Sequence, residues 1–272
     1  MDYDGMELTE ENLQILITNA EAGEAEAQYD LGAAYLKGKG VAEDKETAVF
    51  WFRKAAEQGY AAAQYVIGST YCNDYKDNEQ AIFWLTKAAE QGYMNAQFNL
   101  GTIYYNINDT EHGRFWWEKA AEQGHVDAQN YLGSIYWKGH GVVKDKESAI
   151  FWYQKAAEQG HMNAQYNLGG LYYDDDYDCK LAVFWLTKAA EQGHMSAQYL
   201  LGTAYLYGDG VAKNEGTAVL WFRKSAEQGV AHAQNMLGNC YYQGIGVPRD
   251  LELAEYWYQK AREQGHDMDY WD

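Results

Sequence analysis

The stretch EAEAQYDLGAAYLKGKGVAEDKETAVFWFRKAAEQG, residues 24–59, decides the fold because close copies of it fill the rest of the chain. Its A-Q-x-x-[LI]-G motif starts at Ala27, Ala63, Ala96, Ala128, Ala164, Ala197 and Ala233. Its ending, AEQG, also recurs, with Arg262 replacing the alanine of the last copy. Such a period is typical of stacked two-helix repeats. We therefore predict seven repeats: 24–59, 60–92, 93–124, 125–160, 161–193, 194–229 and 230–265.

Each repeat contains two segments with helical periodicity. In the first segment of repeat one, Ala27, Leu31 and Tyr35 fall on one face at 3.6 residues per turn. The second segment, 45–58, places its apolar residues with the same periodicity. The chain has a single proline, which also favours helices over a sandwich or barrel. The sequence therefore predicts an all-α chain of antiparallel helix pairs.

Glycine and short polar residues mark the ends of the predicted helices. Each E-Q-G glycine stands where a helix ends in a left-handed residue, which Gly adopts without Cβ strain. In four repeats a G-x-G-V turn joins the helices, at 38–41, 139–142, 208–211 and 244–247. The other three have the shorter linkers 73–78, 106–110 and 174–178. After the G-x-G-V turns, the residues expected to cap the second helices are Asp44, Asp145, Asn214 and Asp250.

A glycine column and a tryptophan column run through the repeats. The glycines inside the first helices are Gly32, Gly68, Gly101, Gly133, Gly169, Gly202 and Gly238. Because Gly costs about 1 kcal/mol against Ala inside a helix, its recurrence indicates close helix–helix approach. The tryptophans of the second helices are Trp51, Trp84, Trp116, Trp152, Trp185, Trp221 and Trp257. We predict that each Trp ring packs over the glycine of its repeat as part of the core.

These residues resemble the Sel-one-like repeat (SLR) family, relatives of the tetratricopeptide repeats. The resemblance rests on A-Q-x-x-L-G-x-x-Y, G-x-G-V-x-x-D, A-x-x-W-x-x-K-A-A and the E-Q-G terminator. It implies a right-handed superhelical α-solenoid that serves as a scaffold for protein complexes, with the first helices lining a concave surface. Some family members carry a cysteine pair in each repeat and are associated with cell-wall or β-lactam chemistry. This chain lacks such pairs.

Residues 1–23 predict an N-terminal capping helix. Thr9 can cap it, and Leu8 and Leu13 have the spacing of a hydrophobic staple. A repeat protein needs such a helix because each repeat buries its face only against its neighbours. The apolar face of the helix consists of Leu13, Leu16, Ile17 and Ala20.

The C-terminal tail, 266–272, is too short for another helix pair. Tyr270 and Trp271 either fold back over the last repeat or belong to a free stub. The first residues, MDYDGMELTEEN, lack the basic and apolar regions of a secretory signal, and no apolar run reaches the roughly 20 residues that cross a bilayer. Three cysteines without a paired pattern favour the cytoplasm.

The formal net charge of −19 argues against nucleic acid and anionic membranes as partners, because both require a positive surface. The charge is concentrated at the ends. Residues 1–23 contain six acidic and no basic residues, and 266–272 contain three acidic and no basic residues. The repeats between them are close to neutral, which also weakens mimicry of nucleic acid by an acidic surface.

The sequence indicates neither a catalytic residue nor a cofactor. It contains no zinc-ligand spacing, no G-x-S-x-G elbow and no dinucleotide loop. Histidines follow the E-Q-G terminator in four repeats, where Tyr60 and Tyr93 stand in two others, so we interpret them as structural. The acidic run 174–178 is interpreted as a solvated linker, with adventitious Ca²⁺ as the alternative. The Lys–Glu pairs of the second helices, such as Lys54 and Glu57, predict an exposed ion-paired face.

A second stripe on the first helices, the inner stripe, is the candidate binding surface. It carries no charge, and large rings alternate with small residues, which suggests shallow pockets suited to protein recognition. The alternative is that the rings pack against the next repeat. The inner stripe consists of Tyr29, Ala33, Leu36, Tyr65, Ser69, Cys72, Phe98, Thr102, Tyr105, Asn130, Ser134, Trp137, Tyr166, Gly170, Tyr173, Tyr199, Thr203, Leu206, Asn235, Asn239 and Tyr242. The residues expected to contact a partner are Tyr29, Tyr65, Phe98, Tyr105, Asn130, Trp137, Tyr166, Tyr173, Tyr199, Asn235 and Tyr242.

The leading hypothesis is a non-enzymatic scaffold or adaptor that binds a protein or peptide along this stripe. A basic partner is favoured because acidic surroundings speed its encounter. A narrower version is a bacterial immunity protein that neutralises a basic toxin. The alternative class is a cell-wall or β-lactam hydrolase, which only the family resemblance suggests. The sequence leaves the oligomeric state open.

Overall fold

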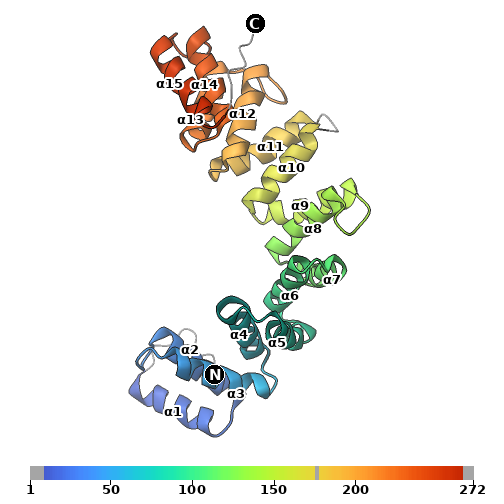
Figure 1. Cartoon of the computed structure of the whole chain (residues 1–272), viewed down its shortest axis with the longest axis vertical. Coiled ribbons are helices and arrows are strands. Elements are labelled where there is room, and N and C mark those ends of the chain that lie inside the picture. Colours follow the sequence, from blue (N-terminus) through green and yellow to red (C-terminus); the bar gives the residue numbers. More distant parts are fainter. Residues whose placement is uncertain (1–8, 175–177, 266–272) are drawn as a thin grey trace. The chain divides into compact units, whose positions relative to one another are not determined.

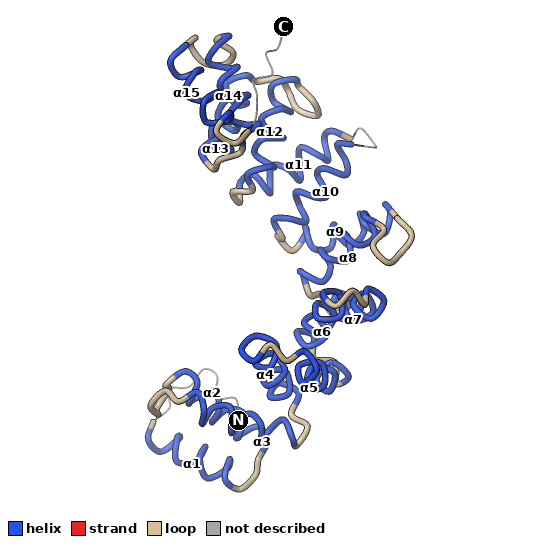
Figure 2. Tube along the Cα trace, viewed as in Figure 1, coloured by secondary structure: helices blue, strands red, loops and turns tan. Residues whose placement is uncertain are grey.

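The computed structural model describes residues 9–174 and 178–265, and every regular element in these ranges is helical (Figure 1, Figure 2). The chain divides into an N-terminal unit, residues 1–128, and a C-terminal unit, residues 129–272. The elements of the N-terminal unit are α1 (Glu10–Glu21), α2 (Ala25–Lys37), α3 (Lys45–Glu57), α4 (Ala61–Thr70), the π-helix η1 (Tyr71–Tyr75), α5 (Asn78–Glu90), α6 (Met94–Asn106) and α7 (Thr110–Glu122). They are followed by α8 (Val126–Lys138), α9 (Lys146–Glu158), α10 (Met162–Asp174), α11 (Cys179–Glu191), α12 (Met195–Tyr207), α13 (Glu215–Glu227), α14 (Ala231–Gln243) and α15 (Leu251–Arg262).

Consecutive helices pack in pairs, and each pair packs on the next one of its unit. In the N-terminal unit, α2 contacts α3, α4 contacts α5, and α6 contacts α7. In the C-terminal unit, α10, α12 and α14 contact α11, α13 and α15 in the same way. Further contacts join α3 to α4, α5 to α6, α9 to α10, α11 to α12 and α13 to α14. The all-α class and the paired repeats are thus confirmed, and each unit is a solenoid of helix pairs.

The glycine column lies against the second helices as predicted, but the residue above it is not the tryptophan. A Cβ added to Gly202 would lie 2.7 Å from the Phe222 ring. In every repeat the covering residue comes directly after the tryptophan: Phe52, Leu85, Trp117, Tyr153, Leu186, Phe222 and Tyr258. The predicted Trp–Gly pairing is therefore wrong by one residue. In α13, Trp221 and Phe222 come three and four residues after Ala218, so both lie near the helix face that carries this alanine. Only Phe222 faces the glycine of the first helix.

The tryptophan column packs between repeats instead. Trp51 contacts the buried cluster of α1 and α2, and Trp84 contacts the cluster formed by α3 and α4. Trp221 and Trp257 make the equivalent contacts in the C-terminal unit. Trp185 is buried, with 8% of its surface exposed. The other members of the column are only half-buried, so the prediction that they belong to the core holds only in part.

A ladder of glutamine side chains links neighbouring helices. In α12 the buried Gln198 donates from Nε2 to the Ala190 carbonyl of α11 at 3.1 Å. Its Oε1 accepts from Nε2 of Gln228, at the end of α13, at 2.8 Å. Each buried amide thus connects three helices with both ends satisfied, which removes the cost of burying it. The same two bonds are made by Gln28, Gln64, Gln97, Gln165 and Gln234.

The predicted caps are confirmed. Asp44, Asp145, Asn214 and Asp250 each accept a hydrogen bond from a backbone N–H in the first turn of the helix that follows. The E-Q-G glycines adopt left-handed backbone, as at Gly59, where φ is +93°. Short linkers use the same device, since Asp178 accepts from the backbone N–H of Leu181 at 3.1 Å.

The second glycine of the G-x-G-V turn permits contact with the preceding repeat. A Cβ on Gly210 would overlap the Cys179 carbonyl at the start of α11. A Cβ on Gly246 would overlap the Glu215 carbonyl at the start of α13. The loop after α14 therefore lies directly on the beginning of α13, which shapes the cavity described below.

The predicted N-terminal capping helix is α1. Thr9 accepts a hydrogen bond from the Asn12 backbone N–H at 3.3 Å. Leu16 and Ala20 are buried against α2, with Leu13 and Ile17 packed beside them. The proposed staple residue Leu8 lies outside the described residues. So do residues 175–177 of the acidic linker and the tail 266–272 with Tyr270 and Trp271.

Adjacent glycines in α10 give a direct test of the glycine column. A Cβ on Gly169 would lie 2.8 Å from Leu186 Cγ, whereas a Cβ on Gly170 meets nothing within 4 Å. We expect Gly169→Ala to lower the free energy of unfolding by about 1–3 kcal/mol through overpacking. Gly170→Ala should raise it by about 1 kcal/mol through helix propensity. Thermal and urea unfolding followed by circular dichroism measure both, and equal effects would contradict the close-approach explanation.

The glutamine ladder can be tested at Gln198. Gln198→Met keeps the side-chain length but leaves the Ala190 carbonyl and the Gln228 amide without this partner. We expect a loss of about 2 kcal/mol in unfolding free energy. The control is Gln154→Met, which removes an exposed bond to Glu158 and should change stability by less than about 0.5 kcal/mol. If the ladder contributes nothing to stability, Gln198→Met and Gln154→Met will have the same free energy of unfolding.

Candidate functional site

The inner stripe lies on the first helices of the repeats, and most of it is half-buried. Leu36 and Tyr242 are the most open members, with 42% and 43% of their surfaces exposed. Leu206 and Asn239 are buried, with 8% and 6% exposed. The stripe is therefore neither an open surface nor a closed core, and the contacts of each ring decide what it can do.

In the N-terminal unit, three rings of the stripe pack on the residue that begins the next repeat. The ring centroids of Tyr29 and Tyr60 are 5.2 Å apart, and those of Tyr65 and Tyr93 are 5.1 Å apart. Burial raises the pKa of Tyr93 above its usual value. Farther along, Phe98 stacks on His125 at 4.2 Å and Tyr105 packs on Trp117 at 5.2 Å. These predicted site residues all take part in packing.

The C-terminal unit repeats this arrangement. Tyr166 stacks on His194 at 4.2 Å, and Tyr199 packs on Phe222 at 6.1 Å. The predicted site residue Asn130 accepts a bond from Nδ2 of Asn167 at 3.5 Å. The packing alternative for the stripe is therefore realised at many positions, and the rings are held in fixed orientations.

Loops bring charged groups onto the uncharged stripe, which the sequence pattern did not indicate. Nζ of Lys144 lies 4.0 Å from the Trp137 ring centroid, and Arg249 lies over Tyr242 at 5.6 Å. The Tyr173 hydroxyl donates to Oδ2 of Asp209 at 2.9 Å. Burial, followed by this hydrogen bond, raises the pKa of Tyr173 well above its usual value. All three charged residues come from the loops that contain the G-x-G-V turns.

A cavity of about 140 Å³ opens beside Trp137 in the C-terminal unit. Trp137 and Tyr166, two predicted site residues, line it together with Gly170 and Asn167. No Cβ fills the space at Gly170, so the two rings flank a gap. The structure thus brings a ring from α8 and a ring from α10 to one concave site.

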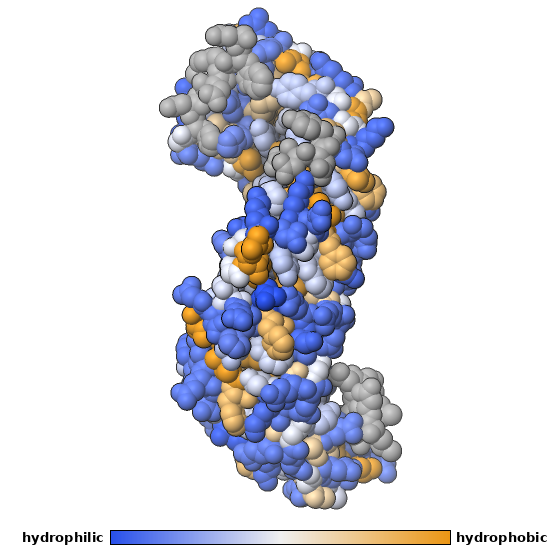
Figure 3. All heavy atoms as spheres, turned by 90° about the vertical axis from the view of Figure 1, so that its right-hand side faces the viewer, coloured by the Kyte–Doolittle hydropathy of each residue, from blue (hydrophilic) through white to orange (hydrophobic). Residues whose placement is uncertain are grey.

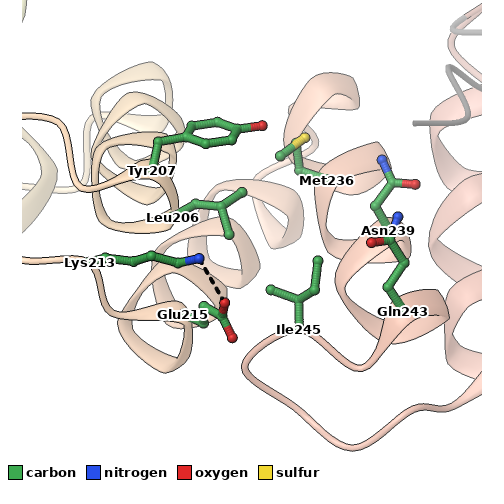
Figure 4. A pocket seen from close by; sticks show the side chains of 8 residues that line it. All are labelled: Leu206, Tyr207, Lys213, Glu215, Met236, Asn239, Gln243 and Ile245. Atoms are coloured by element: carbon green, nitrogen blue, oxygen red, sulfur yellow. Dashed lines mark ion pairs between the residues drawn. The ribbon is translucent and has the colours of Figure 1, made fainter. Parts of the chain in front are cut away.

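A larger cavity of about 210 Å³ lies near the last two helix pairs (Figure 4). The stripe contributes Leu206 from α12 and Asn239 from α14. The predicted site residue Asn235 lies one turn before Asn239, and its buried Oδ1 has no hydrogen-bond partner. Sequence reasoning missed the remaining lining residues. Helix ends and loops supply Tyr207, Lys213, Glu215, Gln243 and Ile245, and Met236 lies inside α14 but outside the inner stripe.

Three histidines that follow the E-Q-G terminator cap the first helices. Nδ1 of His125, His161 and His194 accepts the backbone N–H three residues later, at 3.3, 3.1 and 3.1 Å. Burial lowers the pKa of His125 and of His194. Among residues 9–174 and 178–265, no three His, Cys, Asp or Glu side chains are placed to hold a metal ion.

Exposed apolar side chains on the second helices, six of them aromatic, were also missed. Phe50 is 51% exposed and meets Trp51 edge-on, and Nζ of Lys54 lies 4.9 Å from its ring centroid. These lysines were expected only to pair with glutamate, as Lys260 does with Glu263 at 3.1 Å. A signal existed, because a large apolar residue precedes every tryptophan of the column. On the face drawn in Figure 3, apolar residues form patches separated by hydrophilic ones. The exposed residues are Phe50, Phe83, Phe115, Phe151, Phe184, Leu220 and Tyr256.

Comparisons with known proteins extend the sequence pattern. The Sel1 repeat profile matches residues 25–60, 61–93, 95–125, 126–161, 163–194, 196–230 and 231–266. Searching the curated proteins gave no match. Within the described part of the chain, no helix is long and apolar enough to cross a membrane.

Several solved structures are also similar to this chain. The protective antigen c5321 of uropathogenic Escherichia coli, which has an SLR fold, is 38% identical over 93% of this chain, with a TM-score of 0.87. This chain spans only 56% of that antigen's length. A Sel1 repeat protein from Oxalobacter formigenes is 35% identical over 94% of this chain and 78% of its own, with a TM-score of 0.68. The immunity protein Pa5087 of Pseudomonas aeruginosa is 25% identical over 66% of this chain and 73% of its own, with a TM-score of 0.43.

The histidine caps predict a stability change near neutral pH. Burial places the folded-state pKa of His125 and His194 below the ordinary 6.5, so their contribution is complete above that pH and is lost as pH falls through the folded pKa. We expect the melting temperature to fall between about pH 7.5 and about pH 5.5. The double variant His125→Asn/His194→Asn, whose caps do not titrate, should flatten this slope. The exposed His232→Asn serves as control, and identical slopes in all three proteins would rule out the caps as the cause.

Proposed function

The chain belongs to the Sel1 repeat (SLR) family, and on that premise we propose that it is a non-enzymatic scaffold that binds a protein or peptide partner on its inner stripe. The observation that carries the proposal is the cavity lined by Trp137, Tyr166 and Gly170. Binding hot spots are enriched in Trp and Tyr because large rings gain most from desolvation.

The packing of the stripe supports binding. Tyr166 is held by its stacking on His194, and Trp137 by the cation of Lys144. Side chains that are already ordered lose little conformational entropy when a partner arrives. In this proposal the same rings therefore pack between repeats and contact the partner.

The charge distribution favours a basic partner. The formal net charge is −19, and the acidic excess is largest near the chain ends, so long-range attraction would speed the encounter and weaken as salt is added. An immunity protein that neutralises a basic toxin is a special case of the same binding mode. The proposal places the protein in the reducing cytoplasm, because Cys72, Cys179 and Cys240 are free thiols.

Replacing one ring on each side of the repeats tests this assignment. We expect Trp137→Ala to weaken partner binding at least tenfold, because truncating a hot-spot ring costs about 2 kcal/mol or more. The control is Phe151→Ala, which removes a ring that is 52% exposed on α9 and should leave binding unchanged. Affinity capture from the native host with wild-type and variant baits identifies the partner. Titration of the purified partner then gives the affinities.

Both variants must keep the wild-type circular dichroism spectrum for the comparison to count. A partner that binds Trp137→Ala as tightly as wild type would overturn the inner stripe as the binding surface. A partner lost only with Phe151→Ala would assign binding to the exposed rings of the second helices instead.

A further inference from the structure

The 210 Å³ cavity of the C-terminal unit has the dimensions of a side-chain site. Pockets for drug-sized ligands measure roughly 300–1,000 Å³. This one is smaller, and its apolar walls are Leu206, Met236 and Ile245 (Figure 4). Leu206 and Met236 are each 8% exposed, so they form fixed walls. The cavity therefore fits one long side chain of a partner.

One wall of the cavity carries a buried amide with an unused donor. Asn239 is 6% exposed, and its Oδ1 accepts the Tyr258 hydroxyl at 2.7 Å. Its Nδ2 has no hydrogen-bond partner. It does not pair with the unpartnered Oδ1 of Asn235 one turn earlier. A buried donor without a partner carries an uncompensated desolvation cost, which a ligand with an acceptor would recover.

The corresponding position of repeat four shows that this amide is not needed for packing. There Tyr153 covers the glycine as Tyr258 does, and a hydrogen bond with the Ser134 side chain satisfies its hydroxyl. A serine thus suffices where a tyrosine stands over the glycine. Asn239 satisfies the same hydroxyl and adds an unpartnered buried donor to a residue that lines the cavity.

The charges around the cavity limit what can enter. Glu215 and Lys213 form an ion pair at 3.1 Å, and their side chains are 43% and 58% exposed (Figure 4). The two opposite charges of this pair cancel, so it favours neither an anion nor a cation, and the Asn239 donor opposes a cation at the inner wall. A neutral group with both an acceptor and donors satisfies these two conditions. A primary carboxamide is such a group.

We propose that this cavity binds the side-chain carboxamide of a glutamine presented by the partner protein. The glutamine oxygen accepts from Nδ2 of Asn239, and its NH₂ group donates toward Glu215 or Gln243. Its methylenes pack on Leu206 and Met236. The inference rests on the proposed function, since it assumes a protein partner, and it names one residue that this partner presents.

The test uses the full chain with four blocked tripeptides, N-acetyl-Ala-X-Ala-N-methylamide, in which X is Gln, Glu, Met or Lys, so that only the Gln side chain offers a primary carboxamide. Their shared backbone isolates the side chain. Binding is followed by the NMR signal of the ¹³C-labelled methyl group of Met236, identified with Met236→Leu. We expect saturable shifts with the Gln peptide and at least tenfold weaker binding of the other three. Asn239→Ser should weaken Gln-peptide binding at least tenfold and keep the fold, because repeat four uses serine. Asn239→Thr is the second variant, since repeats three and six carry Thr102 and Thr203 there.

The proposal is overturned if the four peptides bind alike, if none shifts the Met236 signal, or if the Asn239 variants bind the Gln peptide as wild type does. A shift that grows with protein concentration alone would assign the cavity to a second copy of the chain. None of these results changes the Trp137→Ala capture experiment, so the two proposals can fail separately.

Discussion

Every repeat depends on the close approach of its two helices at a glycine without a Cβ. At Gly101, Gly133 and Gly202 an aromatic ring occupies the space where a side chain would stand, and at Gly169 it is a leucine. Interiors packed at crystal-like density do not accommodate an extra carbon there. The distance between the two helices of a repeat sets where their ends lie, and thereby sets the position of the loop that follows. The tryptophan one residue earlier is thereby turned toward the neighbouring repeat, where it joins adjacent clusters.

Two polar devices maintain the register between repeats without adding charge to the interior. The buried Gln198 bonds a carbonyl of the preceding helix and an amide of the following one. His194 caps α12 through Nδ1 and also stacks on Tyr166. Because both groups satisfy fixed backbone atoms, they leave one favourable relative placement of neighbouring helices. The rings of the inner stripe are ordered as a consequence, which is the property that a preformed binding surface requires.

The loops add what the helices lack. The second glycine of the turn lets the loop after α14 lie on the start of α13, and the same loop supplies Ile245 to the cavity with the unpaired Asn239 amide. Elsewhere loops place Lys144 on Trp137 and Asp209 on Tyr173. The charged groups beside the uncharged stripe therefore come from loop residues, which do not belong to the helical pattern of the stripe. Different stretches of the stripe consequently have different charged neighbours.

The sequence by itself determined the repeats, the helix pairs, the caps such as Asp44 and the left-handed glycines such as Gly59, because each rests on local spacing or backbone sterics. It also placed the inner stripe on the first helices. Only the tertiary structure decided that Phe222, not Trp221, covers Gly202, because positions three and four of a helical turn share a face until a partner helix distinguishes them. The unpartnered Nδ2 of Asn239 and the cavity beside it were beyond local reasoning for the same reason: the walls of the cavity come from separate helices and loops, which meet only when the repeats pack.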